Sequence, residues 1–545
     1  MKPSVGKTVL TAAGLVAAIG VLVGLIVAGS RVLVAHGRPA GTVAIGVPYR
    51  LKSLDPLGQP LDLNQPEAIS PFRLVYDTLV ITGPDGRLYP HLASRWEVSP
   101  DGREITFQLR EARFHDGRPV DAAAVKYTLA RLMSDDKAKA LAAALGPLKD
   151  IVVLAPDRVR LVFERPYPPI WSVLSWSGLG IVAPPAAGRP AADAVLGPPG
   201  SGPYVPVSWS EDTLVLSRNQ DYHWLPPFAR DTDGPRLEKI TFRFLPEPGA
   251  RLAAFEHGQV DLAELDQADY AKASTFAGAE LLLVPRPSLT YLGFRVTGGN
   301  AVGEAVREAA ARAVDRVAIL KAAAGPARAE TSILPVGMWS VETGRAPQSV
   351  RYSPEKARSV LAAAGWKDLD GDGRLEKPGP GGSQPEKLKL EILTYGYEWE
   401  RKVATEVAAE LQAVGIDASV TPLEPREVLG RTRDGQAGAF VLTYGWYDPD
   451  ILFYLFHSSR LGQTNRSGLT DPAIDRALEE ALQVVEPAAR SEAYASVAKD
   501  IQSSYVWVPL AGQTTPVLAR RNLAGLSVGG ADEVLLYGAY ARPGR

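Results

Sequence analysis

Apolar and polar residues alternate along residues 388–392, recur at helical spacing along 403–414, and alternate again along 416–420. Alternation with a period of two is typical of a half-buried strand, and recurrence every three to four residues is typical of an amphipathic helix. The order strand, helix, strand predicts an α/β sheet. The same patterns predict further elements, namely helices at 304–320 and from Asp471, and a hairpin of strands at 151–163.

The stretch Leu88–Leu129 predicts a turn, a strand, a second turn and a helix. Pro100-Asp101-Gly102 has the composition of a tight turn, and apolar residues alternate with polar ones along 105–109. Asp121 stands where a helix N-cap is expected, because apolar residues follow it at helical spacing. From the physics alone, this is a generic structural unit.

The amino-acid sequence of this stretch resembles the signature motif of one protein family. Its residues fall in the order and spacing of the peptide/nickel class of ABC-transporter solute-binding proteins, family 5: Pro90, Leu92-Ala93, Trp96-Glu97-Val98-Ser99, Asp101-Gly102, Thr106-Phe107, Leu109-Arg110, Phe114-His115-Asp116-Gly117 and Asp121-Ala122. Other stretches that resemble the oligopeptide- and dipeptide-binding proteins of this family are Leu54-Asp55-Pro56, Gly200-Ser201-Gly202-Pro203-Tyr204, Asp221-Tyr222, 251–261 and 307–316. The resemblance runs from about residue 42 to about residue 520.

The resemblance implies an α/β, two-lobed periplasmic-binding-protein fold of class II, of the large type with an extra subdomain. On this basis the expected regions are lobe I at 41–80, 191–286 and 510–545, the extra subdomain at 81–190, and lobe II at 287–509. Pro285 and Pro287 interrupt an apolar run, and proline does not fit a central strand, so we expect the first crossover between the lobes there. The family's activity implies a monomer that binds a solute between its lobes and passes it to ABC-transporter permease subunits.

Length and composition agree with an exported binding protein. A chain of 545 residues with 22% charged and 46% hydrophobic residues is expected to form two or three globular domains. It has no cysteine, which excludes disulfides, thiol catalysis and a lipidated N-terminal cysteine. Residues 1–40 contain four basic and no acidic residues, so the remaining chain carries a net charge of −6. An acidic body argues against nucleic acid as a partner.

Residues Thr8–Ser30 form an uncharged run of 23 residues. At about 1.5 Å per residue, this run spans a hydrocarbon layer about 30 Å thick. Lys2 and Lys7 precede it, which predicts a cytoplasmic tip and an extracytoplasmic body, periplasmic or at the cell surface. We expect an uncleaved N-terminal transmembrane helix that anchors the protein in the cell membrane. A cleaved signal peptide is the alternative, with Ala28-Gly29-Ser30 as its cleavage site.

The best candidate for a ligand-binding segment runs from Tyr444 to Asp450 and resembles the family's "GW…DP" segment. Its aromatic side chains supply contact area, and Asp448 could hold the ammonium of a peptide. A role of Asp448 as a helix cap is the alternative. The family's usual insertion between Gly-Trp and Asp-Pro is missing, which weakens a peptide assignment. The full set of candidate ligand-binding residues is Tyr444, Trp446, Tyr447, Asp448, Tyr291, Phe294 and Arg295. Trp171 and Trp176 fit either core packing or the lining of a cleft.

Two motifs suggest other chemistry. Gly525-Leu526-Ser527-Val528-Gly529 fits the pattern of a serine hydrolase, but no histidine follows His457, so the required order of residues fails. The loop Asp368–Gly373 fits the first half of a calcium loop, but position 12 is Gly379 instead of the bidentate glutamate. We therefore expect a plain acidic turn, no metal and no cofactor, with bound calcium as the alternative.

The sequence thus predicts a binding protein and not an enzyme. Its most concrete function is to bind a small solute, first of all a peptide, and deliver it to an ABC importer. The alternative is a membrane-anchored sensor or assembly partner that reuses the solute-binding fold and signals by contact. The missing insertion and the uncleaved anchor favour that alternative, whereas release of a bound small molecule from the pure protein argues against it.

Overall fold

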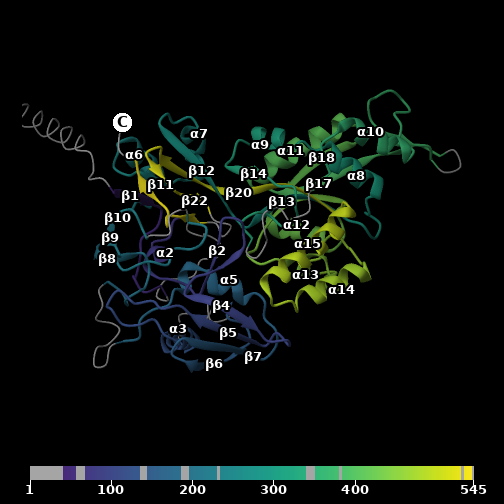
Figure 1. The fold of residues 1–545 in the computed structure, drawn as a ribbon. Coiled ribbons are helices and arrows are strands. Elements are labelled where there is room, and N and C mark those ends of the chain that lie inside the picture. Colours follow the sequence, from purple (N-terminus) through teal and green to yellow (C-terminus); the bar gives the residue numbers. More distant parts are fainter. Residues whose placement is uncertain are drawn as a thin grey trace, which may run out of the picture.

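The computed structural model describes residues 41–56, 68–134, 144–185, 196–229, 234–338, 350–379, 383–528 and 533–542. They form two α/β lobes and a smaller β-rich subdomain, which lies below the first lobe in Figure 1. The predicted membrane-spanning run, Thr8–Ser30, lies outside the described residues. Within the described ranges, no helix combines the length and apolar character needed to cross a bilayer.

Lobe I is built on a mixed sheet in which β1 pairs in parallel with β10 and β11. Its strands are β1 (Thr42–Val47), β8 (Tyr204–Trp209), β9 (Thr213–Arg218), β10 (Lys239–Phe244), β11 (Leu262–Glu264) and β12 (Ala279–Pro285). Its short helices are α2 (Phe72–Val75), α6 (Ala250–Glu256) and α7 (Tyr270–Ala273). The C-terminal strands β21 (Leu523–Ala524), β22 (Ser527–Val528), β23 (Val534–Leu535) and β24 (Tyr540–Ala541) form two small hydrogen-bonded pairs.

The subdomain contains the family-like signature and is an antiparallel sheet in the order β4-β5-β7-β6. Its elements are β4 (Ala93–Val98), β5 (Glu104–Leu109), α3 (Ala122–Ser134), β6 (Leu148–Ala155), β7 (Arg158–Phe163) and α5 (Ile170–Ser175), with β2 (Val80–Thr82) and β3 (Leu88–Pro90) at its border. The predicted cap is confirmed, because an Asp121 oxygen accepts the backbone N–H of Ala124 at 2.9 Å. Trp171 is completely buried in this core, and Trp176 is half-buried beside it.

Lobe II is a sheet in the order β18-β17-β19-β13-β20, with helices on both faces. Its strands are β13 (Ser288–Phe294), β14 (Ala327–Ala329), β17 (Lys389–Tyr395), β18 (Asp417–Leu423) and β19 (Ala439–Gly445). One face is covered by α8 (Glu304–Ala313), α9 (Arg316–Ala323), α10 (Pro354–Ala363) and α11 (Glu398–Ala413). The other is covered by α12 (Pro425–Arg433), α13 (Ile451–Phe456), α14 (Pro472–Ala481) and α15 (Pro487–Ser503). The strand, helix and strand predicted for 388–420 are β17, α11 and β18.

One long strand, β20 (Trp507–Arg520), joins the two lobes and is drawn in yellow through the middle of Figure 1. Its first half pairs with β13 in lobe II, and its second half pairs with β12 in lobe I. The other crossing, the first along the chain, runs from Pro285 to Ser288, where β12 ends and β13 begins, at the place expected from the two prolines. The continuous strand β20 and the short link between β12 and β13 thus connect the lobes, an arrangement suited to hinge bending.

Several family-like motifs meet at one buried carboxylate, Asp77. Its oxygens accept hydrogen bonds from the Tyr222 hydroxyl at 3.1 Å, the Trp224 indole at 3.0 Å and the Ser201 hydroxyl at 3.1 Å. A Cβ on Gly200 would lie 2.0 Å from a backbone oxygen of α2, so only glycine fits there. These residues therefore join two separate parts of lobe I, and His91 of the subdomain meets the same carboxylate at 3.1 Å.

Candidate functional site

The edge of lobe II that faces the crossing strands is formed by the ends of parallel strands. β17 pairs in parallel with β18 and with β19, so Tyr395, Leu423 and Gly445 end at the same edge. β13 runs antiparallel to β19 and starts at this edge, where Ser288 lies opposite Gly445. Ligands of open α/β sheets bind at such carboxyl ends. The side chains that follow these strands are therefore the candidates for contact with a ligand.

Aromatic residues follow two of these strands. Trp446 and Tyr397 are 46% and 60% exposed, which is unusual for such large side chains. The rings of Tyr395 and Tyr397 are 5.9 Å apart, and the Trp446 indole donates a hydrogen bond to Asp450 at 2.8 Å. The two tyrosines were missed in the sequence, although a Tyr-Gly-Tyr directly after an alternating strand was a usable signal.

Besides Trp446, three of the predicted residues belong to this edge or support it. Tyr444 is half-buried, and its hydroxyl donates to the Ile333 carbonyl at 2.7 Å. Tyr447 is half-buried and follows Trp446. Tyr291 is 2% exposed and stacks on Trp507, with ring centroids 3.4 Å apart. Tyr291 is therefore a buried residue that packs beneath the edge, and its side chain does not face solvent.

Phe294 and Arg295 lie at the opposite end of β13. Six steps of about 3.3 Å along β13 place Phe294 about 20 Å from the edge at Ser288. Phe294 is completely buried in the lobe II core. The Arg295 guanidinium donates to the backbone carbonyls of Thr297 at 3.0 Å and Arg466 at 3.2 Å. The structure does not bring these two residues together with Trp446.

Asp448 has protein partners on every side. One oxygen accepts a hydrogen bond from the Arg490 guanidinium of α15 and the backbone N–H of Asp450, the latter at 2.9 Å. The other accepts the Ser172 hydroxyl of α5 at 3.2 Å. Burial and the neighbouring Asp448 carboxylate raise the pKa of Asp450 to about 7. Asp448 thus joins lobe II to the subdomain, and its charge is already paired with that of Arg490.

A second contact connects the same two regions. The Trp171 indole donates to the Val485 carbonyl at 2.6 Å, and the Val485 side chain packs into the subdomain core. Val485 lies between α14 and α15 of lobe II. The subdomain therefore touches lobe II directly, beside the aromatic edge.

Two buried glutamates lie close to the crossing strands. Glu264 ends β11 and Glu330 follows β14, and each has one buried oxygen without a hydrogen-bond partner. A Cβ on Gly512 would lie 2.8 Å from the Glu330 carboxylate, so this glycine lets Glu330 approach β20 at the crossing. Burial raises the pKa of both glutamates to about 7. Sequence patterns did not reveal either of these two carboxylates.

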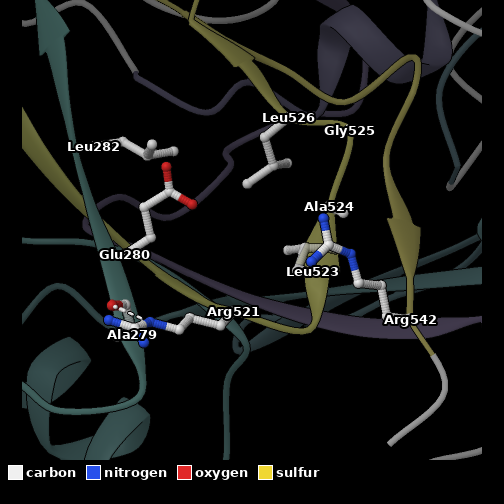
Figure 2. Close-up of a pocket in the computed structure, with 9 residues that line it drawn as sticks. All are labelled: Ala279, Glu280, Leu282, Arg521, Leu523, Ala524, Gly525, Leu526 and Arg542. Atoms are coloured by element: carbon white, nitrogen blue, oxygen red, sulfur yellow. Dashed lines mark hydrogen bonds between the residues drawn. The ribbon is translucent and has the colours of Figure 1, made fainter.

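A separate pocket lies at the far end of lobe I. Figure 2 shows it between β12, β21 and the C-terminal segment, with the Arg521 guanidinium bonded to the Ala279 carbonyl at 3.3 Å. Ala279 is paired with Arg520, six residues along β20 from Thr514, so this pocket is remote from the crossing. Gly525, the first residue of the serine-hydrolase pattern, lies in a turn between two short strands, whereas the hydrolase motif requires a strand followed by a helix.

Comparison with known proteins gives the family. A family model described as "Bacterial extracellular solute-binding proteins, family 5 Middle" matches residues 87–464. The chain is 25% identical over 508 residues to the nickel-binding periplasmic protein of Escherichia coli K12, covering 90% of this chain and 93% of that protein. It is 26% identical over 503 residues to the glutathione-binding protein GsiB of Salmonella paratyphi A, covering 89% and 92%.

A solved structure agrees with these relatives. NikA from Brucella suis in complex with Fe(III)-EDTA is 25% identical, with a TM-score of 0.65 over 92% of this chain and 100% of that one. The relatives named are solute-binding proteins and not enzymes, in agreement with the expectation from the failed catalytic motifs. The two-lobed α/β fold expected from the sequence is confirmed.

Proposed function

The chain belongs to the bacterial extracellular solute-binding proteins of family 5, and from this premise we propose that it binds a peptide between its lobes and delivers it to an ABC importer. Relatives of similar identity bind nickel and glutathione, and glutathione is itself a small peptide. The proposed role places the body outside the cytoplasm, tethered by the helix predicted at Thr8–Ser30.

The observation that carries the proposal is the exposed aromatic pair, Tyr397 and Trp446, at the edge beside the crossing strands. Aromatic rings bury large areas at a small entropic cost and accept varied side chains, as a peptide carrier needs. Tyr444 and Tyr447 extend this surface, and Tyr291 supports it from behind. A bare metal ion would instead call for fixed polar ligands around it.

The ammonium of such a peptide needs a carboxylate, and Asp448 is already bonded to Arg490. Glu330 is the better placed group, because its Oε1 makes no hydrogen bond, its ion-pair partner Arg328 is exposed, and it lies against the crossing strand. We assign Asp448 to the contact between lobe II and the subdomain. When the lobes close around the ligand, the outer surface of the protein changes, and the permease would recognise this closed surface.

Calorimetry on the full-length protein tests the proposal. Short peptides, their N-acetylated twins and a nickel–histidine chelate would be titrated separately, after native mass spectrometry has shown what copurifies. We expect peptides to bind, and acetylated peptides to bind more weakly. Tyr352 is an equally exposed aromatic of lobe II before α10, at 49%, so Tyr352→Ala is the matched control for Trp446→Ala.

Each other outcome has a definite meaning. Binding of the chelate alone would replace the peptide by a metal complex as the ligand. Absence of any bound or copurifying solute would overturn delivery of a solute and support the membrane-anchored sensor. Equal effects of Trp446→Ala and Tyr352→Ala would remove the aromatic edge from the site.

A further inference from the structure

A loop of lobe II remote from the aromatic edge brings three carboxylates together. It follows α10 and leads into β15 (Glu376–Lys377), which pairs with β16 (Glu386–Lys387). Carboxylate oxygens of Asp368, Asp370 and Glu376 all lie within 4.8 Å of one another. Opposite ligands of calcium are about 4.8 Å apart when each calcium–oxygen distance is about 2.4 Å. Oxygens no further apart than this can share the coordination sphere of one calcium ion.

Glu376 supplies the carboxylate that seemed to be missing. It stands at position 9 of the loop, whereas the sequence pattern directs attention to position 12. Its side chain is 2% exposed, and one oxygen accepts the backbone N–H of Leu369 at 3.1 Å. The other oxygen, Oε1, is buried and has no hydrogen-bond partner, and it faces the same Lys387 ammonium as an Asp370 oxygen. A buried carboxylate oxygen without a donor is costly, and a cation at this point would satisfy it.

Lys387, the cross-strand partner of Glu376, balances the charge only in part. Its ammonium lies 3.7 Å from Glu376 Oε1, 3.8 Å from Asp370 and 3.5 Å from Asp372. Charge-assisted hydrogen bonds are about 2.7–2.9 Å long, so none of these contacts is a strong one. The lysine side chain is 44% exposed, and its head can move into water while its stem stays in place.

We propose that Asp368, Asp370 and Glu376 bind one calcium ion, with Lys387 as a built-in competitor. The ligands are all hard carboxylate oxygens, which suits calcium, and magnesium demands a tighter octahedron with shorter bonds. Displacement of the ammonium keeps the affinity low, at a Kd of about 10⁻⁴–10⁻³ M, which is typical of extracellular calcium modules. The loop folds without the ion, because the N–H groups of Gly371 and Gly373 already bind Asp368 at 2.7 and 3.0 Å.

The test is calorimetric titration of calcium chloride into the full-length protein after removal of metals by a chelator. We expect one site. Asp370→Asn and Glu376→Gln should each weaken binding by roughly tenfold or more, because affinity follows the number of charged ligands. Lys387→Met should tighten binding, since the competing ammonium is gone. The matched control is Glu386→Gln, an exposed carboxylate on the same hairpin, which should leave the affinity unchanged.

The opposite signs of these variants separate a site from an acidic turn. A turn held by its lysine would bind no calcium and would lose stability in Lys387→Met. Absence of binding at several millimolar calcium, or binding that Asp370→Asn leaves unchanged, would overturn the proposal. Asp370 is exposed, so its asparagine variant will fold even if Glu376→Gln does not. Titration with magnesium chloride should give much weaker binding, and equal binding would overturn the choice of calcium.

Discussion

The carboxylate of Asp448 accepts a hydrogen bond from the guanidinium of Arg490, 42 residues further along the chain. Both side chains are buried, Arg490 completely. The pair fixes the start of the α13 region on α15, and Ser172 of the subdomain adds a third member at 3.2 Å. The segment that sequence reasoning selected for its ligand chemistry is thus also a structural junction.

Removal of one partner of this pair should be costly. Asp448→Leu leaves a buried guanidinium unpaired, and we expect a loss of about 3–5 kcal/mol in the free energy of unfolding. The double variant Asp448→Leu, Arg490→Met should recover part of this loss, because no charge then stays buried. Urea unfolding of the natural protein, the single variant and the double variant measures these differences. Equal instability of the single and double variants would contradict an isolated ion pair.

The same residue can be tested for contact with the ligand. If Asp448 held a peptide's ammonium, acetylation of the peptide and Asp448→Asn would each be severe and together little worse than either alone. Because Asp448 is bonded to Arg490 and Ser172, we expect instead that the two losses in binding free energy add. Calorimetry of both peptides with both proteins decides between these outcomes.

The aromatic edge gives a second prediction. Truncation of an exposed aromatic that packs on a ligand costs about 2 kcal/mol or more, which is roughly thirtyfold in affinity. We expect losses of this order for Trp446→Ala and Tyr397→Ala. Both side chains are largely exposed, so the melting temperature should change little. A fall in melting temperature without a change in affinity would mean that these rings serve the fold only.

Local patterns predicted what depends on neighbouring residues. The alternation at 388–420 predicted β17, α11 and β18, and Asp121 was recognised as a cap because a cap and its helix are adjacent in sequence. The family-like motifs were recognised from their residues and spacing. The hydrogen bonds that these residues make to Asp77 could not be predicted from the sequence. Those bonds join residues as far as 147 positions apart.

Residues of the site depend more on such distant contacts. Nothing near Asp448 indicates that Arg490 will neutralise it, and nothing in the run 281–295 indicates that Phe294 faces away from the crossing. Glu376 was overlooked because the loop closes through β15 and β16, a pairing that position counting does not include. Sequence patterns find residues of the right chemistry, and the sheet register decides which of them meet.

The full-length protein is expected to stay with membranes. The reason is the uncharged run Thr8–Ser30, whose 23 residues extend about 35 Å as a helix. Alkaline carbonate extraction followed by blotting should leave it in the membrane pellet, and a variant that starts at residue 41 should be released. A mature protein whose N-terminal sequence begins near Arg31 would contradict the anchor and show that a signal peptide is cleaved.

Stability should fall as the pH rises from about 5 to about 7, because of the glutamates at the crossing. Burial raises the pKa of Glu264 from 4.5 to about 7, and Arg251 and Arg286 only partly oppose this shift. Between these two pKa values the folded protein binds more protons than the unfolded chain. Raising the pH therefore favours unfolding, by about 3 kcal/mol for a group shifted by about 2.5 units.

Glu264→Gln removes this titration while keeping the size of the side chain. The variant should lose less stability than the natural protein when urea unfolding is compared at pH 5 and pH 8, and most of the difference should arise below pH 7. Glu280 on β12 is exposed, so Glu280→Gln is the matched control and should leave the pH dependence unchanged. If Glu264→Gln has the same pH dependence as the natural protein, Glu264 is ionised in the folded state. Its unpartnered oxygen would then need a cation at the crossing, and the nearby Arg286 would be the residue to replace next.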